Sequence, residues 1–262
     1  MLRGIYTSAS GMVADQRRLD VVANNLANVT TTGYKRETTV SQSFDEFLIQ
    51  RVHDRDALGR GLPPTQIGRL GIGTYVVNTT ARLTTGSLQQ TGNPLDVALA
   101  GDGFFTVNTP QGLRYTRQGS FLQDADGTLI TPQGHPVLVN GSPLTAAPGS
   151  LAINEQGQVL ANGQVRGQLE VVTSRQLGAI RKEGDGLWVQ AGANEANTLV
   201  TPAEATGQYT LKVGFLEASN VEAVSEMVQM METMRSFEAN QRALQAQDET
   251  LGRAVNDIGR IG

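Results

Sequence analysis

Near the C-terminus, the apolar residues follow a regular pattern. From about residue 220 to residue 258 they recur at alternating spacings of four and three, which is the heptad pattern of a helix that packs along one seam. Only Gln241 and Asp248 are polar on this seam, so the pattern predicts one long helix. The seam positions are Ala223, Met227, Met230, Met234, Phe237, Gln241, Leu244, Asp248, Leu251, Val255 and Ile258.

The N-terminus carries a matching pattern, in which Gln16 is the one polar seam position. This helix should end within residues 28–33, where β-branched threonines and a glycine make further helix unfavourable. The seam positions are Leu2, Ile5, Ala9, Met12, Gln16, Leu19, Ala23 and Leu26. Two terminal helices with matching seams are therefore expected.

Two features of these helices leave alternatives open. Val224, Val228 and Met231 form a second apolar stripe near the start of the C-terminal helix, so that end should be covered on two sides. The three polar seam residues either face water or a channel, or they pair between copies of the chain and fix the register of packing at some cost in stability.

Between the helices, short apolar runs alternate with polar residues and glycine, which is typical of many short strands joined by tight turns. Residues 76–219 are expected to form an all-β body with Phe104, Phe105, Tyr115 and Phe121 in its core. The strongest strand signals are Phe104–Val107, Leu113–Thr116, Thr128–Thr131 after a turn at Asp124–Gly127, His135–Val139, Gln168–Thr173, Gly186–Gln190 and Tyr209–Phe215.

Residues 33–75 are less regular and predict an extended connector. A short helix is expected at Phe44–Arg51. The segment Asp56–Gly68, with its glycines and prolines, should be an extended loop that either reaches a neighbouring copy or lies at the surface. The predicted fold class is α+β, with a coiled-coil-like helical domain from residues 1–32 and 220–262, this connector, and the β-rich body.

Composition and charge narrow the function classes. The 262 residues carry a net charge of -4 and no cysteine, which excludes a disulfide framework. Their Lys and Arg residues form no stripe, which argues against a protein that binds nucleic acid by neutralising phosphates. No run approaches the roughly 20 apolar residues of a membrane span, and the N-terminus is too polar for a signal peptide. The chain should either stay in the cytosol or leave it by an unconventional route.

The residues that carry enzyme chemistry are sparse. His53 and His135 have no carboxylate at metal-ligand spacing, and neither Gly71–Gly73 nor Gly101–Gly103 opens a helix after a strand as a nucleotide site requires. Asp124–Gly127 begins like a calcium loop, but a histidine stands where the bidentate glutamate belongs, so a hairpin turn is expected. We predict no catalytic, cofactor or metal site, while a hydrolase that uses two distant carboxylates stays open.

Three blocks of sequence form a set of motifs. The first joins Ser8–Met12, Leu19–Asn28 and Thr32–Lys35, the second joins Asp96–Leu99, Gly101–Phe105 and Tyr115–Phe121, and the third joins Gly214–Glu222 and Arg235–Asn240. In order and in distance from the termini, the blocks resemble the flagellar rod and hook proteins over nearly the whole chain. The matching motif residues are Asn24, Asn25, Asn28, Gly33, Tyr34, Gly103, Phe104, Phe105, Tyr115, Arg117, Gly119, Phe121, Ser219, Asn220 and Val221.

The resemblance implies a structural subunit that polymerises helically into the hollow flagellar drive shaft between motor and hook. It implies no cofactor, no nucleic acid and no membrane insertion. The partners would be copies of the chain, other rod subunits, the hook protein, the surrounding ring proteins and the flagellar export apparatus. The subunit would reach the periplasmic basal body by type III export without a cleaved signal peptide. Length favours the distal rod, with the proximal rod or another basal-body homologue as the alternative.

The terminal helices are the expected subunit interface. Burying a large apolar side chain contributes about 1.5–3 kcal/mol, while ordering each backbone residue costs about 1–2 kcal/mol, so one helix alone is not stable. We expect both helices to be mobile in the monomer and to become ordered when copies stack in an open polymer. The predicted interface residues are Leu2, Ile5, Met12, Leu19, Leu26, Met227, Met230, Met234, Phe237, Leu244, Leu251, Val255 and Ile258.

The sequence leaves open the role of three asparagines and two rival functions. The asparagines at positions 24, 25 and 28 either complete hydrogen bonds at the end of the first helix or contact another copy. Two rival functions come from other classes: a secreted β-domain glycoside hydrolase, and a carbohydrate- or peptide-binding module whose helices form a closed oligomer of fixed size.

Overall fold

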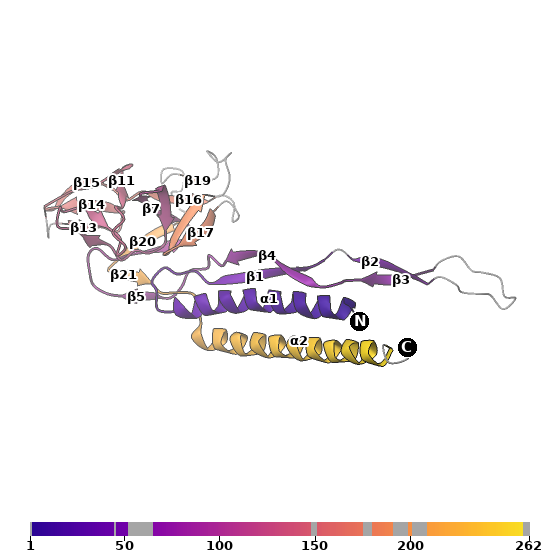
Figure 1. The fold of residues 1–262 in the computed structure, drawn as a ribbon. Coiled ribbons are helices and arrows are strands. Elements are labelled where there is room, and N and C mark those ends of the chain that lie inside the picture. The colour runs from indigo at the N-terminus through magenta and orange to yellow at the C-terminus, as the bar shows by residue number, and fades with distance from the viewer. Residues whose placement is uncertain are drawn as a thin grey trace. The chain divides into compact units, whose positions relative to one another are not determined.

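The computed structural model describes residues 2–44, 46–51, 65–147, 151–174, 180–190, 199–200 and 209–258. Within these residues, helix α1 (Leu2–Ala27) lies near the N-terminus, helix α2 (Ala223–Ile258) lies near the C-terminus, and short strands occupy the middle of the chain (Figure 1). The predicted α+β class with a β-rich middle is confirmed.

The chain forms two compact units. The first, called the helical unit below, contains the described parts of residues 1–26, 37–80 and 223–262. The second, called the body, contains those of residues 27–36 and 81–222. Each unit therefore combines segments that lie far apart in the sequence.

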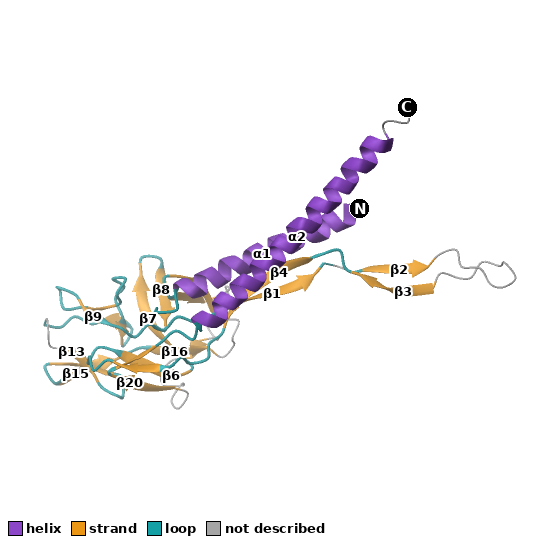
Figure 2. Cartoon of the chain, turned by 90° about the horizontal axis from the view of Figure 1, so that it is seen from below, coloured by secondary structure: helices purple, strands orange, loops and turns teal. Residues whose placement is uncertain are grey.

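In the helical unit, α1 and α2 lie side by side and run antiparallel, and a ribbon of strands accompanies α1 (Figures 1 and 2). The Thr7 hydroxyl donates to the carbonyl of Ile72 at 3.0 Å, and the Ser10 hydroxyl accepts from the N–H of Thr74 at 3.3 Å, so hydrogen bonds tie this ribbon to α1. The ribbon consists of β1 (Glu37–Ser43) paired with β4 (Thr74–Ala81), and β2 (Phe47–Arg51) paired with β3 (Thr65–Leu70).

The short helix predicted at Phe44–Arg51 is wrong, because this segment contains strand β2. Its residues pair antiparallel with β3, with Phe47 opposite Leu70. A partner strand satisfies the backbone groups of a segment that is too short to be a stable helix by itself. The expected loop over residues 56–68 also ends earlier, since Thr65–Leu70 is a strand, and the part of it before residue 65 lies outside the described residues.

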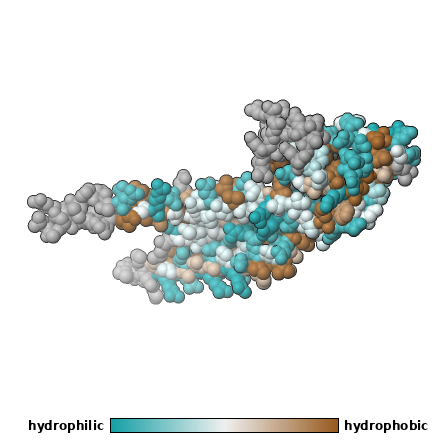
Figure 3. All heavy atoms as spheres, turned by 180° about the vertical axis from the view of Figure 1, so that it is seen from behind, coloured by the Kyte–Doolittle hydropathy of each residue, from teal (hydrophilic) through white to brown (hydrophobic). Residues whose placement is uncertain are grey.

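The β2–β3 hairpin exposes several apolar side chains. Phe47, Leu48, Ile49 and Ile67 are 61%, 50%, 38% and 62% exposed. Figure 3 shows brown apolar atoms on this part of the ribbon, beside the grey atoms at the left of the view. Exposed apolar patches on a strand pair are typical of surfaces that another molecule covers.

Among its described residues, the body contains a six-stranded sheet in the order β17-β18-β8-β7-β16-β19 and a three-stranded sheet β13-β14-β15. Four further pairs are β10-β9, β11-β12, β20-β6 and β21-β5. The strands are β5 (Leu88–Gln90), β6 (Val97–Gly101), β7 (Phe104–Thr109), β8 (Gly112–Thr116), β9 (Leu122–Gln123), β10 (Leu129–Ile130), β11 (Leu138–Val139), β12 (Ser142–Pro143), β13 (Leu151–Ile153), β14 (Gln158–Ala161), β15 (Gln164–Gln168), β16 (Val171–Ser174), β17 (Ile180–Gly184), β18 (Leu187–Gln190), β19 (Leu199–Val200), β20 (Tyr209–Val213) and β21 (Phe215–Glu217).

Most of the strong strand signals correspond to observed strands. β7, β8, β10, β18 and β20 lie where the apolar runs predict them. The run Gln168–Thr173 is divided, because β15 ends at its first residue and β16 begins at Val171. The predicted turn Asp124–Gly127 is confirmed as a hairpin turn, in which the N–H of Gly127 donates to the carbonyl of Asp124 at 2.8 Å.

The body core lies on both faces of β7, because successive side chains of a strand point to opposite sides. Phe105 belongs to the larger cluster, where its ring meets that of Phe121 edge to face at 5.1 Å between centroids. Phe104 belongs to a smaller cluster with Trp188, and Tyr115 packs against that cluster. The four aromatic residues expected in the core therefore lie in it or against it.

Replacing Phe105 by alanine should destabilise the body by about 3–5 kcal/mol, because a fully buried ring leaves a cavity. Urea denaturation followed by fluorescence measures this change, since Trp188 is the single tryptophan of the chain and lies in the body. Leu122→Ala is the control, because this side chain is 49% exposed. The control should change stability by less than about 0.5 kcal/mol. A similarly small effect of Phe105→Ala would contradict the assigned core.

Candidate assembly surfaces and a buried polar network

The row of α2 that faces α1 is half polar. Its positions alternate by four and three residues, as the heptad pattern predicts, and Glu226 and Thr233 are buried while the others are half-buried. Four residues of this row, Met230, Phe237, Leu244 and Leu251, belong to the predicted seam. Each of the other five lies one position before a predicted seam residue. The row consists of Glu226, Met230, Thr233, Phe237, Asn240, Leu244, Gln247, Leu251 and Ala254.

The facing row of α1 shows the same displacement by one residue. It contains small and polar residues in place of the predicted apolar ones, and Ser8, Asp15, Val22 and Asn25 are buried in it. The row consists of Gly4, Ser8, Gly11, Asp15, Arg18, Val22 and Asn25. Small residues allow two helices to approach closely. A Cβ atom added at Gly11 would lie 2.9 Å from the Asn240 side-chain nitrogen.

Polar contacts fix the antiparallel register of the two helices. The Asp15 carboxylate accepts hydrogen bonds from the Ser236 hydroxyl at 2.8 Å and from the Asn240 amide at 3.1 Å. At the other end of the pair, the Asn25 amide donates to the buried Glu226 carboxylate at 3.2 Å. Buried polar groups need such partners, so sliding one helix along the other would leave these groups without their hydrogen bonds.

Four predicted interface residues, Met230, Phe237, Leu244 and Leu251, belong to the α2 row that faces α1, whereas the other described ones lie outside the two contact rows. Ile5, Met12, Leu19, Leu26, Met230, Phe237, Leu244 and Leu251 are half-buried, and Met227, Met234 and Val255 are exposed. The side chains of Leu2 and Ile258 lie outside the described part. The polar seam residues Gln16, Gln241 and Asp248 are exposed. In the single chain they therefore face water. Every described interface residue keeps accessible surface.

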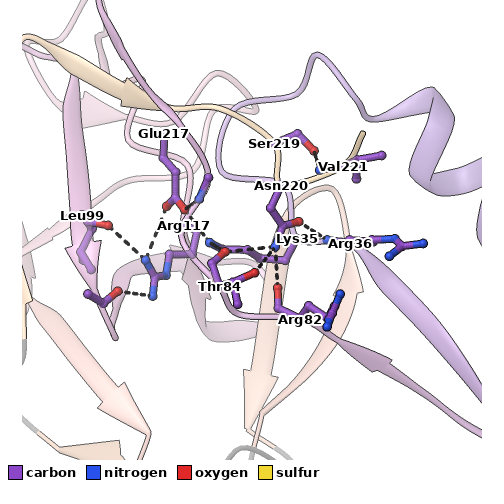
Figure 4. A network of polar contacts seen from close by, with 12 residues as sticks. Lys35, Arg36, Arg82, Thr84, Leu99, Arg117, Glu217, Ser219, Asn220 and Val221 are labelled. Atoms are coloured by element: carbon purple, nitrogen blue, oxygen red, sulfur yellow. Dashed lines mark hydrogen bonds and ion pairs between the residues drawn. The ribbon is translucent and has the colours of Figure 1, made fainter. Parts of the chain in front are cut away.

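The body contains a buried ion network centred on Glu217 (Figure 4). One carboxylate oxygen of Glu217 lies 2.5 Å from the Lys35 ammonium nitrogen, and the other lies 3.4 Å from the Arg117 guanidinium. All three side chains are 1% exposed. Backbone carbonyls extend the network, since Arg117 donates to Leu99 at 3.2 Å and to Gly101 at 2.6 Å.

Burial lowers the pKa of Lys35 and that of Arg117, because the charged forms lose hydration. The Glu217 carboxylate opposes this effect in both groups by stabilising their charged forms. Lys35 also donates to the carbonyl of Thr84 at 3.0 Å. One carboxylate thus serves as the counter-charge for two cations that water cannot reach.

The segments next to this network are held together by backbone contacts. Asn220 accepts a hydrogen bond from the N–H of Arg36 at 2.6 Å, and its amide donates to the carbonyls of Arg82 at 2.8 Å and Thr84 at 3.0 Å. Gly33 has a φ of 68°, and a Cβ there would lie 2.6 Å from the carbonyl of Arg117, so only glycine fits. Within the body, the chain entering after α1 is therefore fastened beside the chain leading to α2.

The asparagines near the end of α1 lie in different surroundings. Asn25 is buried and makes two hydrogen bonds with the backbone of Glu37, at 2.8 and 2.9 Å, in addition to its bond with Glu226. Asn28 accepts from the Thr31 hydroxyl at 3.2 Å in the turn after the helix, and Asn24 is exposed. Asn25 and Asn28 therefore both make hydrogen bonds around the end of the helix.

The remaining motif residues support the body. The Lys182 ammonium lies 3.5 Å from the centre of the Tyr34 ring, and the Arg117 guanidinium lies over the Phe104 ring. Gly103 packs against Val171 and Leu99. Gly119 accepts from the N–H of Val97 at 2.9 Å, the Ser219 hydroxyl accepts from the N–H of Val221 at 3.2 Å, and burial raises the pKa of Tyr115.

The sequence pattern assigned no role to four charged residues that organise the two units, namely Asp15, Glu226, Lys35 and Glu217, although Lys35 and Glu217 lie in the motif blocks Thr32–Lys35 and Gly214–Glu222. A signal was present for Glu226, which directly precedes a predicted seam methionine. No pattern in the sequence linked Glu217 to its partner Lys35, because the two residues are 182 positions apart.

Metal-ligating side chains are scattered in the part of the chain that the structure describes. No cluster of three or more His, Asp or Glu side chains there could hold a metal ion. His135 is half-buried, and His53 lies outside the described residues. No described helix is both long and apolar enough to cross a bilayer.

Comparisons with known proteins give a consistent result. Residues 5–35 match the family described as flagella basal body rod protein, residues 98–161 match the flagellar hook protein FlgE/F/G D1 domain, and residues 212–257 match the flagellar basal body rod FlgEFG protein C-terminal family. The chain is 33% identical to the flagellar hook-basal body complex protein FlhO of Bacillus subtilis, over 100% of both chains. It is 34% identical to the flagellar basal-body rod protein FlgG of the same bacterium, over 98% of this chain and 99% of that one. It is 30% identical to FlgF of Caulobacter vibrioides, over 100% of both.

The exposed apolar side chains of the helical unit are typical of a protein that packs into a larger assembly. The chain belongs to the flagellar basal-body rod family and is a structural subunit of the flagellar rod. This family is structural and not enzymatic, so the glycoside hydrolase hypothesis is set aside.

Replacing Glu217 by glutamine should destabilise the body by about 3–5 kcal/mol, because Lys35 and Arg117 would lose their buried counter-charge. Urea denaturation followed by Trp188 fluorescence gives the change in unfolding free energy. The matched control is Glu222→Gln at an exposed position, with an expected change below about 0.5 kcal/mol. Equal denaturation midpoints for Glu217→Gln and the unchanged chain would show that the carboxylate is not essential to the network.

Replacing Asn25 by alanine should destabilise the α1–α2 contact by about 1–3 kcal/mol, since Glu226 and the Glu37 backbone would lose a buried hydrogen-bond partner. Amide hydrogen exchange read by mass spectrometry should become faster at the C-terminal end of α1 and at the start of α2. Gln16→Ala, at an exposed position of α1, is the control and should leave exchange unchanged. Unchanged exchange in Asn25→Ala would contradict the role given to this contact.

Proposed function

We propose that the chain forms the distal part of the flagellar rod by polymerising with copies of itself into a hollow helical shaft between motor and hook. The observation that carries this proposal is the α1–α2 pair, whose internal contact is about half polar while Tyr6, Val13, Met231 and Met234 remain exposed. Apolar helix faces gain stability when another molecule covers them. Full-length similarity to FlgG proteins supports the distal position. The similarity to FlgF and FlhO keeps a proximal rod or other basal-body position as the alternative.

We further propose that residues 1–32 and 220–262 act in the polymer as a coiled-coil-like axial domain. The four-and-three spacing of the contact rows supports this arrangement. Residues 33–75 would connect this domain to an outer β layer formed by residues 76–219. The exposed apolar side chains of the β2–β3 hairpin suit a connector that touches a neighbouring copy.

The two helices are proposed to be weakly ordered in the monomer and firmly ordered in the polymer. Glycine, serine and aspartate in the α1 row bury little apolar surface, so tertiary packing within one chain stabilises the pair only modestly. Neighbouring copies would supply the missing apolar contacts. Stiffness of the shaft would then follow, because several neighbours hold each subunit along its length.

Membership of the rod family supports the partners and the location that we propose. Other rod subunits, the hook protein and the surrounding ring proteins would contact the polymer in the periplasm. The chain would arrive there through the flagellar type III export apparatus, without a cleaved signal peptide. No cofactor and no nucleic acid take part in this function.

Removing residues 1–26 or residues 223–262 should abolish polymer formation, because each deletion takes away one of the two helices. Negative-stain electron microscopy shows whether filaments form, and Trp188 fluorescence, which should be unchanged, shows whether the body stays folded. Filaments formed by either truncated chain would contradict the proposal. A closed oligomer of fixed size formed by the full chain would favour the binding-module hypothesis instead.

A further inference from the structure

Helix α2 has a second apolar face that is not used within the chain. We call it the methionine stripe: Val224, Met227, Val228, Met231 and Met234, which are 65%, 44%, 44%, 52% and 50% exposed. The residues follow one another at the spacings of a single helix face. Among the described residues of the helical unit, none buries this stripe, whereas Glu226 and Thr233 in the row facing α1 are buried.

The methionine stripe is continuous with the existing α1–α2 contact. Met230 is half-buried in the row that faces α1, and it is three residues from Met227 and four from Met234. Residues at these spacings are neighbours on a helix surface. A further helix placed on the stripe would therefore extend the packing already present by one more helix.

The same chain carries a matching apolar row on α1. Tyr6 and Val13 are 70% and 62% exposed and are seven residues apart. They lie roughly opposite the glycine positions that face α2, as the helical period of 3.6 residues requires. A single chain cannot place its own α1 row on its own α2 stripe, because the other face of α1 already contacts α2.

The charges of the two helices favour contact between unlike helices. α1 contains three arginines and two aspartates, while α2 contains three arginines and six acidic residues. An α1 helix is therefore attracted to α2, whereas two α2 helices repel each other.

We propose that the methionine stripe of one copy receives the Tyr6–Val13 row of α1 from a second copy. The contact joins two different surfaces, and each added copy presents both surfaces again, so the polymer continues to grow. This inference rests on the proposed self-assembly and specifies its contact. The polar rows join the helices of one chain, and the apolar stripe joins that chain to its neighbour.

The absence of cysteine allows a direct cross-linking test. Full-length Val13→Cys and Met231→Cys are mixed in equal amounts, allowed to polymerise, and oxidised with copper phenanthroline, and the linked peptides are identified by mass spectrometry. A disulfide between the two substituted positions should exceed that of a control pair at least about tenfold, because polymerisation holds the two thiols at high effective concentration. The control pair is Val13→Cys with Val165→Cys, a 54% exposed position in the body.

Each other outcome has a defined meaning. Disulfides mainly between two Met231→Cys copies would indicate a closed two-fold contact and overturn the inference. Filaments without cross-links above the control would overturn the inference while leaving self-assembly intact. If the unsubstituted chain formed no filaments, the proposed function would fail first.

A charge on the stripe provides a second, independent measurement. Met231→Glu should raise the protein concentration needed for filament growth at least about tenfold, because a buried methionine contact would be replaced by a charge. The melting temperature of the monomer should stay the same, because this side chain is half exposed there. Leu113→Glu in the body, 53% exposed, is the matched control and should change neither quantity. An unchanged threshold concentration for Met231→Glu would overturn the inference.

Discussion

The carboxylate of Glu217 neutralises two buried cations that come from distant parts of the chain, Lys35 at 182 residues and Arg117 at 100 residues. Such a network adds little net stability when it is complete, because removing the hydration of three charges costs about as much as their attraction returns. Its specificity is the larger effect. Any arrangement of the body that separates one member leaves an uncompensated charge away from water, so a single arrangement of these segments is strongly preferred.

In the helical unit, too, buried polar groups need partners and so select one arrangement. Polar and small residues share the rows between α1 and α2 with apolar ones, and hydrogen bonds at Asp15 and Glu226 select one register. Other apolar residues are exposed on the outside of the pair. The usual distribution, with apolar residues inside and polar residues outside, is thereby partly inverted, and this inversion suits a subunit whose outer surface becomes an interior after assembly.

The period of the apolar pattern was sufficient to place both helices within a few residues, and the alternation around Phe104 and Phe105 was sufficient to place β7. The phase of the helices was not predictable. Spacing defines how often a residue returns to one face, but the face that packs depends on where Gly11 admits close approach and where Asp15 meets Asn240, 225 residues away. The helix predicted at Phe44–Arg51 was wrong for a similar reason. The conformation of this segment depends on its pairing with β3, which its own sequence does not reveal.

The position of Glu217 late in the sequence has a consequence for how the chain is made. Synthesis proceeds from the N-terminus, so Lys35 and Arg117 leave the ribosome long before the carboxylate that neutralises them. Until residue 217 emerges, closing the body would bury two bare cations, and β6 would lack its partner β20. The body can therefore close only after residue 217 has emerged, late in translation.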